Sequence, residues 1–323
     1  MRHATPRLAR GQKRTDAAPM TVELGVFAPG RLEILRRLLS DPSLAPEFEA
    51  LQGPQGLERV LADPFSGPEL RWLAFRDGEP AGFCWAFVIP TREGSFAMLR
   101  PGVVARARRT GIGSRLIETA SAAVRELAPQ CRELCLTAWV PSPEAAGFAA
   151  RHGYEHARFY WLMERPQHGS APQVDWPPGV EVETFDGTER ALGHWSEAYN
   201  RSFAEHYHGA LSTPESVRAL AAVPGFRPDG VLLAHRTGAC VGFCQNQLLP
   251  GRGEVATLGV VPEARGIGLG RALLRWGVGW LEHQAAPRVT LTVDGENEGA
   301  LSLYRSEGFE TVRKREIWSR RLP

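Results

Sequence analysis

The stretch VPEARGIGLG at residues 261–270 decides the fold, and VARARRTGIG at residues 104–113 repeats its pattern. Each stretch reads as the end of an apolar strand, then an arginine, then a Gly-x-Gly that opens an amphipathic helix. Aligning the arginines sets the stretches 157 positions apart, and the tripeptide GFC at residues 82–84 recurs at nearly that offset, at residues 242–244. We interpret the chain as an internal duplication.

The glycines of the second stretch indicate an anion site. Glycine at a strand-to-helix turn adopts backbone conformations closed to other residues and lets a ligand approach the main chain. The first amides of the following helix are unpaired at the positive end of its dipole, so they suit a phosphate group. Gly266, Gly268 and Gly270 do not fit the Gly-x-Gly-x-x-Gly fingerprint, and no Gly-Lys-Ser/Thr follows. The spacing therefore disfavours the familiar NAD and ATP sites.

The two loops and their flanks resemble the GNAT family of acyl-CoA-dependent N-acyltransferases. The family signature, Arg/Gln-x-x-Gly-x-Gly/Ala between a strand and a helix, matches residues 108–113 and residues 265–270. After the second copy come a strand-like run at residues 289–293 and then Asn297 and Tyr304, which are similar to the second half of that family. The resemblance implies two tandem GNAT-like domains of the α/β class, each with a mixed, largely antiparallel sheet, and acetyl-CoA as co-substrate.

Length and composition fit two domains joined by a linker. A chain of 323 residues exceeds one typical domain, and the segment RPQHGSAPQVDWPP is polar and rich in proline. We predict a first domain over residues 20–164, a linker over residues 165–178 and a second domain over residues 179–323. Residues 1–19 are basic and lack the apolar core of a secretory signal, so we expect a disordered extension.

Both halves show a similar order of predicted elements. The first half is predicted to contain strand 22–27, helix 31–39, a hairpin turning at residues 77–78, strand 96–104, helix 112–127 and strand 133–139. The second half is predicted to contain strand 180–185, helix 190–203, a helix that begins at residues 213–214, a hairpin turning at residues 237–238, strand 254–261, helix 269–281, strand 288–293 and helix 297–306.

Composition narrows the partners. Hydrophobic residues make up 43% of the chain, yet no apolar stretch approaches the roughly 18 residues of a membrane span, so we expect no membrane crossing. The formal net charge of +2 predicts no nucleic-acid partner. The five cysteines form no Cys-x-x-Cys motif, so we expect reduced thiols, a cytoplasmic location and no metal. Cys84 and Cys244 occupy matching positions, which favours small core residues over nucleophiles.

The resemblance implies that an amine attacks the thioester of acetyl-CoA in the second repeat. An amine with a pKa near 10.4 is mostly ammonium at neutral pH, so a base or a water chain must remove a proton. Related enzymes place a glutamate at the start of the strand that enters the loop, which makes Glu254 the candidate base. Tyr304 matches the family tyrosine and is the candidate acid for the departing thiolate. The structural alternatives are an exposed strand-start glutamate and a core-filling aromatic residue.

The resemblance also implies a surface for the acyl carrier. Backbone groups of the strand are expected to bind the pantetheine arm as a sheet edge binds a peptide, and the loop is expected to hold the pyrophosphate. Asn297 is expected to cap a helix, with a second role in contacting the carrier. The residues expected to bind acetyl-CoA are Leu258, Gly259, Val260, Arg265, Gly266, Ile267, Gly268, Leu269, Gly270, Arg271 and Asn297.

In the first repeat the same positions lack both proton-transfer groups. Tyr304 carried back by 155 positions falls on Ala149, and Glu254 carried back by 157 falls on Ala97. We therefore predict that the first repeat is catalytically degenerate. It either walls the acceptor cleft or forms a second CoA site with Arg108, Arg109, Thr110, Gly111, Ile112 and Gly113.

The predicted function is N-acetyl transfer from acetyl-CoA to a primary amine of a small molecule or peptide by direct attack. The alternative is a non-catalytic acyl-CoA-binding sensor or scaffold, against which the presence of both Glu254 and Tyr304 counts. The amine stays open among an aminoglycoside, another small amine and a peptide N-terminus. A cluster between the first two helices of the second repeat is expected to contact it, with solvated loop histidines as the alternative: Phe203, His206, Tyr207 and His208.

Overall fold

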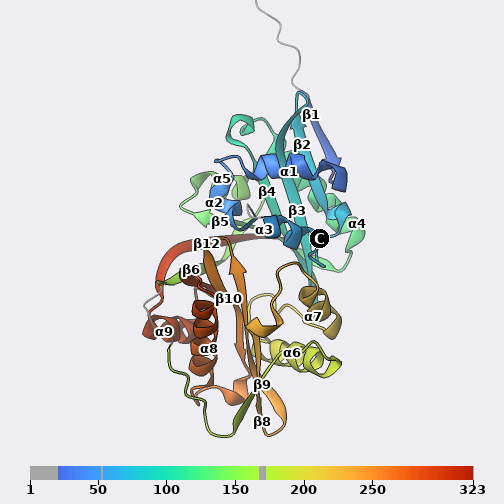
Figure 1. Ribbon diagram of the computed structural model, residues 1–323. Helices are drawn as coiled ribbons and strands as arrows, with labels where there is room; N and C mark the ends of the chain where they lie inside the picture. The colour runs from blue at the N-terminus through green and yellow to red at the C-terminus, as the bar shows by residue number, and fades with distance from the viewer. Residues whose placement is uncertain (1–20, 52–53, 167–171, 323) are drawn as a thin grey trace, which may run out of the picture.

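The computed structural model describes residues 21–51, 54–166 and 172–322. Two repeats stack end to end and share one twelve-stranded sheet, flanked by helices (Figure 1). Among the described strands, β4 with β5 and β10 with β11 pair in parallel, and the other neighbours pair antiparallel. The predicted mixed α/β fold is confirmed. The predicted extension over residues 1–19 lies outside the described residues.

The two repeats contain equivalent elements. The first consists of β1 (Val22–Val26), α1 (Leu32–Leu39), α2 (Ala45–Phe48), α3 (Pro54–Leu61), β2 (Arg71–Arg76), β3 (Glu79–Thr91), β4 (Gly94–Val103), α4 (Ile112–Leu127), β5 (Cys131–Val140), α5 (Pro143–Arg151) and β6 (Glu155–Pro166). The second consists of β7 (Val180–Thr184), α6 (Glu189–Ser202), α7 (Pro214–Ala221), β8 (Val231–Arg236), β9 (Ala239–Leu249), β10 (Arg252–Val260), α8 (Leu269–His283), β11 (Arg288–Asp294), α9 (Glu298–Ser306) and β12 (Glu310–Arg321).

Local sequence explains where these elements turn and begin. Both predicted hairpins place two residues with positive φ at the tip, 51° and 78° at residues 77–78 and 52° and 81° at residues 237–238. That pair matches the twist of antiparallel strands. Helix α7 begins after Thr213, whose side chain accepts a hydrogen bond from the Ser216 amide, and the Ser216 side chain accepts one from the Thr213 amide. Pro214 occupies the first helical position.

The last strand of each repeat is exchanged with the other repeat. The strand order is β1-β2-β3-β4-β5-β12-β6-β11-β10-β9-β8-β7, so β12 of the second repeat lies beside β5 of the first, and β6 lies beside β11. Strands β6 and β12 pair with each other at the centre. Because β6 and β12 are equivalent strands, the order reads the same from either end, as a pseudo-two-fold axis requires.

The exchange also builds the cores. Trp318 of β12 is 5% exposed within the core of the first repeat, and Met163 of β6 is fully buried within that of the second. The two residues lie 155 positions apart, at matching places in the repeats. Cys84 and Cys244 are fully buried in these cores, which confirms the prediction that they are core residues. Each core is therefore completed by a residue from the other repeat.

In the second repeat, helices cover both faces of the sheet. Along β8, Val231 and Leu233 pack with α6, whereas Leu232 and Ala234 pack with the core beneath α8. Alternate residues of a strand face opposite sides, so α6 and α8 lie on opposite faces. This sandwich leaves the carboxyl end of β10 to meet α8 through the glycine loop.

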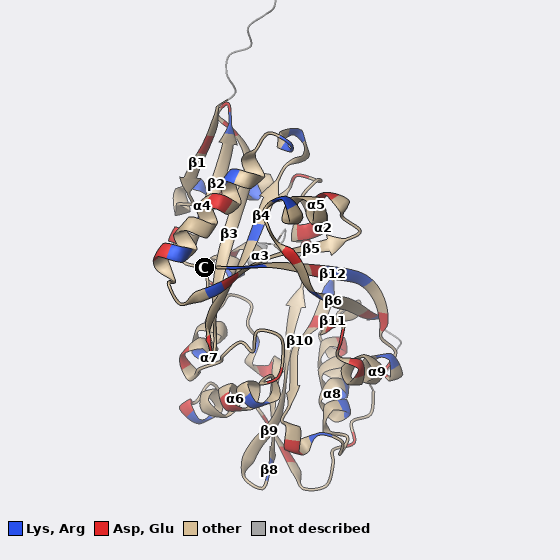
Figure 2. Cartoon of the chain, turned by 180° about the vertical axis from the view of Figure 1, so that it is seen from behind, with Lys and Arg blue, Asp and Glu red and all other residues tan. Residues whose placement is uncertain are grey.

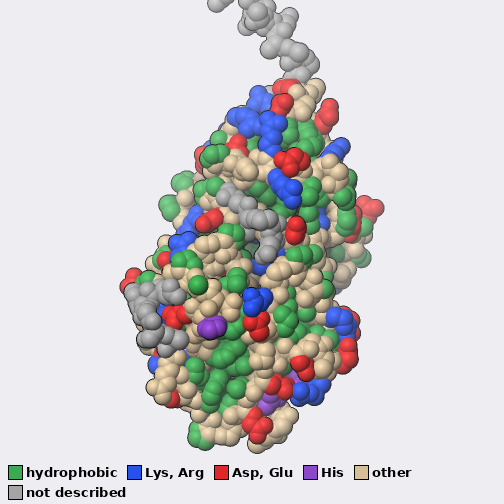
Figure 3. Space-filling model, in the orientation of Figure 1, with side chains coloured by type: hydrophobic (Ala, Val, Ile, Leu, Met, Phe, Trp, Pro, Cys, Tyr) green, Lys and Arg blue, Asp and Glu red, His purple; other side chains and the backbone are tan. Residues whose placement is uncertain are grey.

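Charged and hydrophobic side chains are interspersed over the molecule in the views shown. Figure 2 shows basic and acidic residues interspersed along both repeats, and Figure 3 shows hydrophobic, basic and acidic side chains interspersed over one face. None of the described helices has the length and hydrophobicity needed to cross a membrane.

Candidate active site in the second repeat

The site begins where β10 and β11 separate. β10 pairs with β11 at residues 253–255, and its register with β9 shifts between Val255 and Thr257. β9 continues to pair with β10 as far as Val260. Among the described strands, none therefore pairs with the β11-facing edge of β10 over residues 256–260. Its main-chain groups are placed to bind an extended ligand as a neighbouring strand would.

A cavity of about 880 Å³ opens between the separated strands. The unpaired part of β10, the end of β11, the glycine loop and the start of α9 form its walls. The residues expected to bind acetyl-CoA that line it are Leu258, Gly259, Val260, Arg265, Gly266, Gly268, Gly270, Arg271 and Asn297. Ile267 and Leu269 do not line it with the others, since the Ile267 side chain is 37% exposed and Leu269 is buried beneath α8.

Two glycines shape the loop between β10 and α8. Gly266 has a φ of +80° and Gly268 a φ of +91°, both in the left-handed region that disfavours a residue with a Cβ. Gly268 is the N-cap of α8, and the Ala272 amide donates to its carbonyl. The amides of residues 269–271 consequently have no partner within the helix and lie at the positive end of its dipole. This turn is suited to a pyrophosphate.

The Arg265 side chain is bound to the protein's own main chain. Its Nε donates to the Val260 carbonyl at 3.3 Å, and its Nη2 donates to the Ser202 carbonyl at 3.1 Å. Arg271 is also engaged, with its Nη1 2.8 Å from Oε1 of Glu307. Arg265 thus ties the loop to the ends of β10 and α6, and the backbone amides are the groups left to hold an anion.

Asn297 and Tyr304 both reach the cavity from α9. Asn297 is the N-cap of this helix, because its side chain accepts a hydrogen bond from the Ala300 amide at 3.0 Å. The Tyr304 ring is half-buried, and its hydroxyl has no hydrogen-bond partner among the described residues. Burial, with Cys244 nearby, raises the pKa of Tyr304 to about 12. The phenol therefore keeps its proton at neutral pH.

Glu254 lies on β10 just before the residues that line the cavity. Its Oε2 accepts a hydrogen bond from Nε2 of Gln247 at 2.5 Å, and Oε1 of Gln247 accepts one from Nη1 of Arg59 at 2.8 Å. Burial raises the pKa of Glu254, while the Gln247 hydrogen bond and the positive charges of Arg252, Arg315 and Arg59 oppose that rise. A chain of two hydrogen bonds therefore links this carboxylate to α3 of the first repeat.

The first repeat also supplies part of the cavity wall. Arg158 and Tyr160 of β6 line it. Nε of Arg158 lies 2.8 Å from Oδ2 of the buried Asp294, and its Nη1 lies 2.8 Å from Oε2 of Glu296. Sequence reasoning missed these residues, because it did not predict β6 or the exchange that carries β6 across. The 155-residue offset between Arg158 and Arg313 shows that they occupy equivalent positions. It does not show which repeat's cavity each side chain lines.

The four residues expected near the acceptor divide between two places. Phe203 and His206 line the cavity, and burial lowers the pKa of His206, which favours the neutral imidazole. Tyr207 and His208 are not on this wall, and the His208 ring packs on Phe96 of the first repeat with ring centroids 4.0 Å apart. Neither histidine is fully exposed. The loop after α6 therefore contacts both repeats.

The corresponding region of the first repeat keeps the shape but not the side chains. A cavity of about 420 Å³ lies between the separating ends of β4 and β5. Ala97 and Ala149, which replace Glu254 and Tyr304, are buried. Pro101 lies on the wall at the position of Leu258, and proline has no backbone N–H to donate.

The first glycine loop is braced like the second. Nε of Arg108 donates to the Val103 carbonyl at 3.1 Å, and Gly111, with a φ of +85°, is the N-cap of α4. Arg109 occupies the place of Gly266 and has a φ of +63°, so a residue with a Cβ is held in the left-handed region. The residues named for a second CoA site that line this cavity are Arg108, Arg109, Gly111 and Gly113.

The fold, the open strand edge and the glycine turn define an acyl-CoA-dependent acyltransferase, and comparison with known proteins agrees. The Acetyltransferase (GNAT) family matches residues 35–154 and again residues 194–309. The chain belongs to this family, as two tandem GNAT units, and is an acyl-CoA-dependent N-acetyltransferase that uses acetyl-CoA.

Among curated relatives, the chain is similar to proteins named mycothiol acetyltransferase. The one from Thermomonospora curvata is 36% identical over 78% of this chain and 82% of its own length, and the one from Geodermatophilus obscurus is 33% identical over 91% and 96%. This agrees with the resemblance to mycothiol synthase that is indicated by the Gly-Glu-Val at residues 253–255 and by the alanines that the first repeat has at the positions of Glu254 and Tyr304.

Solved structures share the tandem fold. A GCN5-related N-acetyltransferase from Sphaerobacter thermophilus aligns with a TM-score of 0.72 at 23% identity, over 93% of this chain and 95% of that one. A tandem GNAT protein from the clavulanic acid biosynthesis pathway aligns with a TM-score of 0.67 at 19% identity, over 93% and 98%. At these identities the likeness supports the fold alone.

Proposed function

We propose that the second repeat transfers the acetyl group of acetyl-CoA to a primary amine of a small molecule or peptide by direct attack. The observation that carries the proposal is the cavity, whose walls combine an open strand edge, an anion-binding helix start and Tyr304. The amine nitrogen bonds to the thioester carbonyl carbon, the C–S bond then breaks, and CoA leaves as a thiolate. One proton must leave the nitrogen and one must reach the sulfur.

Glu254 is the proposed base. Its carboxylate lies beside the cavity rather than on its wall, so the proton travels from the amine through water. Burial makes the carboxylate more basic than an exposed glutamate, and the surrounding arginines oppose its protonation. The two effects together suit a group that must accept a proton near neutral pH and release it again.

Tyr304 is the proposed acid. A phenol with a pKa of about 12 holds its proton more strongly than a thiol with a pKa near 8.5. It therefore stabilises the departing thiolate by donating a hydrogen bond, and the sulfur takes its proton from solvent as CoA leaves. The hydroxyl is available for this task, since no described residue accepts its proton.

The amine-bearing precursor of mycothiol is the acceptor to test first, because the curated relatives are named for that product. Glu205 and Glu298 lie exposed on the cavity wall, whereas the buried Asp294 is already paired with Arg158. Carboxylates near the mouth attract an ammonium group and raise its local concentration. The same wall would also suit other cationic amines, so the assay needs a panel.

We propose that the first repeat does not turn over substrate. Ala97 and Ala149 supply no group that can move a proton, and Pro101 removes one main-chain donor from the strand edge. Its glycine loop keeps an anion-binding helix start at Gly111, so a weak second CoA site is the most that this cavity supports.

The test is acetyl-CoA-dependent thiol release across cysteinyl glycosides, aminoglycosides, polyamines and short peptides. With the best acceptor, Glu254→Gln is expected to lower kcat by about 10²- to 10⁴-fold, the usual size of a general-base contribution. Tyr304→Phe is expected to lower it by about 10²- to 10³-fold, since one hydrogen-bond donor to the developing thiolate is lost. Both variants should bind CoA normally in calorimetry. Turnover that survives both substitutions would disprove the site, and CoA binding without turnover on any amine would support a sensor.

A further inference from the structure

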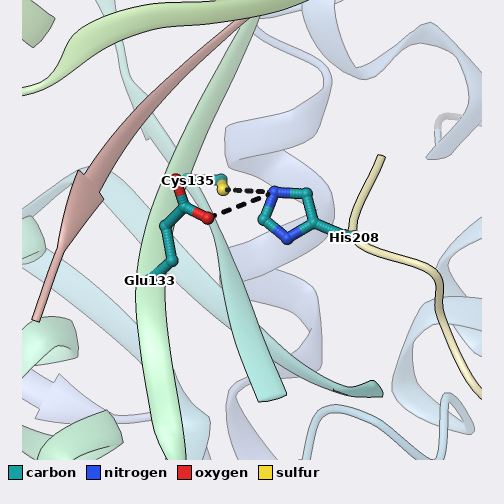
Figure 4. Close-up of side chains that lie close together, drawn as sticks. All are labelled: Glu133, Cys135 and His208. Carbon is teal, nitrogen blue, oxygen red and sulfur yellow. Dashed lines mark hydrogen bonds and ion pairs between the residues drawn. The ribbon is translucent and has the colours of Figure 1, made fainter. Parts of the chain in front are cut away.

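A second group of chemically capable side chains lies outside this cavity, where the loop after α6 meets β5. Glu133 and Cys135 are two residues apart on β5, so their side chains point to the same face of the sheet. His208 comes from the loop of the second repeat. Figure 4 shows a carboxylate oxygen, a thiol sulfur and an imidazole nitrogen facing one another.

The distances suit a shared ion better than hydrogen bonds. Nε2 of His208 lies 3.5 Å from Oε2 of Glu133 and 3.8 Å from Sγ of Cys135. A good N–H···O hydrogen bond spans about 2.7–3.2 Å, so the first contact is long. Around Zn²⁺, with bonds of about 2.0–2.2 Å to nitrogen and oxygen and about 2.3 Å to sulfur, tetrahedral ligand atoms lie about 3.3–3.8 Å apart. All three donor atoms lie within 4.8 Å of one another.

The surroundings hold the donors in place and leave one side open. Cys135 is fully buried, whereas the side chains of His208 and Glu133 are 10% and 24% exposed. The loop is fastened by the Leu211 amide, which donates to the Pro90 carbonyl at 2.9 Å. An ion would therefore enter from the Glu133 side, and a water molecule would complete four ligands there.

A second cluster, Glu183, His194 and His235, is explained without an ion. Glu183 lies 3.0 Å from His235 and 2.8 Å from Arg190, so a permanent cation already neutralises this carboxylate. Among the described residues, no lysine or arginine forms an ion pair with Glu133. Within the part of the chain that the structure describes, Glu133, at the junction of the repeats, therefore lacks a counterpart to the Arg190 guanidinium that pairs with Glu183.

We propose that Glu133, Cys135 and His208 bind Zn²⁺, which fastens the acceptor-side loop of the second repeat to the first. On binding, the thiol loses its proton to solvent as the Zn–S bond forms. The ion would link the two repeats, and its presence departs from the expectation that the chain uses no metal. Phe203 and His206 of the same loop line the catalytic cavity, so the ion would stabilise that wall.

The test uses the full chain without an affinity tag, stripped with a chelator and titrated with Co²⁺. Tetrahedral Co²⁺ bound to a thiolate gives a sulfur-to-metal charge-transfer band in the near ultraviolet, and Zn²⁺ should displace it. We expect the band in the wild type and its loss in Cys135→Ala. Cys131→Ala is the matched control, since Cys131 is a buried thiol of the same strand that packs in the core of the first repeat and should keep the band.

His208→Ala is expected to weaken Zn²⁺ binding at least about tenfold, because a direct ligand matters at least as much as the groups that orient one. A wild-type protein without the sulfur band would overturn the proposal, and so would a band that persists in Cys135→Ala. The spectrum needs no turnover, so its failure is separate from any failure of the acetyltransferase assay.

Discussion

The two repeats share a scaffold and differ in the side chains that line their cavities. In both, an arginine Nε donates to the carbonyl five residues before it, at 3.1 Å from Arg108 and 3.3 Å from Arg265, and a left-handed glycine opens the helix. Yet the tyrosine of the second repeat, Tyr304, is Ala149 in the first. The glycine loop is therefore common to both repeats, and the proposed proton-transfer groups on the neighbouring strand and helix are present in the second alone.

The two repeats are not structurally independent, because each supplies residues to the other. β6 of the first repeat supplies Arg158 and Tyr160 to the cavity of the second repeat, and α3 supplies Arg59 to the Glu254 hydrogen-bond chain. In return, β12 of the second repeat supplies Trp318 to the core of the first. The first repeat thus forms part of the candidate active site, although Ala97 and Ala149 stand at its own positions equivalent to Glu254 and Tyr304.

The largest effect is expected from cutting the chain between the repeats. Expressed alone, a half that ends at the linker retains β6 but lacks β12, so the β5 edge and the space filled by Trp318 are left open. An unpaired edge next to an open core promotes aggregation. We expect each half to be insoluble or unfolded by circular dichroism, and the two halves expressed together to recover a folded, active complex.

A half that folds by itself as a stable monomer would contradict the conclusion that each repeat depends on the strand exchanged with the other. It would mean that β6 can take the place of β12 beside β5, and that the exchange is an arrangement of the intact chain rather than a requirement. Size-exclusion chromatography of the co-expressed halves distinguishes a complex from two independent domains.

Equivalent glycines should give a smaller and asymmetric effect. Gly268→Ala places a Cβ at a φ of +91°, and Gly111→Ala places one at +85°. Both should destabilise by about 1–2 kcal/mol, the usual cost of the left-handed conformation. Only Gly268→Ala should also raise the KM for acetyl-CoA, by about tenfold, because its loop holds the co-substrate that is turned over. Equal changes in KM would show that both repeats bind the acyl donor used in the reaction.

Removing Arg59 should change the pH dependence of the reaction more than its maximum rate. As the proposed base, Glu254 acts in its deprotonated form, and loss of a nearby positive charge raises its pKa further. The acid limb of the kcat/KM profile should therefore move to higher pH in Arg59→Ala, with a loss of about three- to tenfold on that limb and little loss above it. Arg59→Lys should recover part of the shift.

Arg37→Ala is the control for this variant, since Arg37 is an exposed arginine of α1 that pairs with Glu79. Its pH profile should match the wild type. If Arg59→Ala instead lowers the rate equally at every pH, Arg59 serves only to pack α3, and the link through Gln247 carries no electrostatic influence.

The sequence predicts the elements well where local signals are strong. Helix α4 spans the predicted residues 112–127, both hairpins turn at the predicted dipeptides, and Thr213 caps α7. These features depend on turn chemistry and on periodicity within a short window. The duplication was visible because equivalent residues lie at similar offsets, such as 155 positions for Ala149 and Tyr304 and 157 positions for Arg108 and Arg265.

The exchange of β6 and β12 could not be predicted in this way. Equivalent strands have similar patterns, so either one satisfies the edge of β5, and pairing depends on long-range packing such as the burial of Trp318 and Met163. For the same reason the sequence did not place Arg158 in the catalytic cavity or His208 against β5. Contacts between repeats are a property of the assembled sheet.

The smallest effect is expected from exchanging the residues that follow Arg108 and Arg265, which are Arg109 and Gly266. Arg109 has a φ of +63° and forms no hydrogen bond or ion pair with the described residues, so Arg109→Gly relieves about 1–2 kcal/mol of backbone strain. Glycine also makes the unfolded chain more flexible, at a cost of about 0.5–1 kcal/mol. The net expectation is a gain of up to about 1 kcal/mol, seen as a Tm higher by about 1–2 °C, with unchanged turnover.

The reverse change, Gly266→Arg, should lower the Tm and weaken acetyl-CoA binding, because Gly266 lines the cavity of the second repeat. If Arg109→Gly lowers the Tm instead, the Arg109 side chain contributes to the first repeat, and its left-handed backbone is held for that contribution.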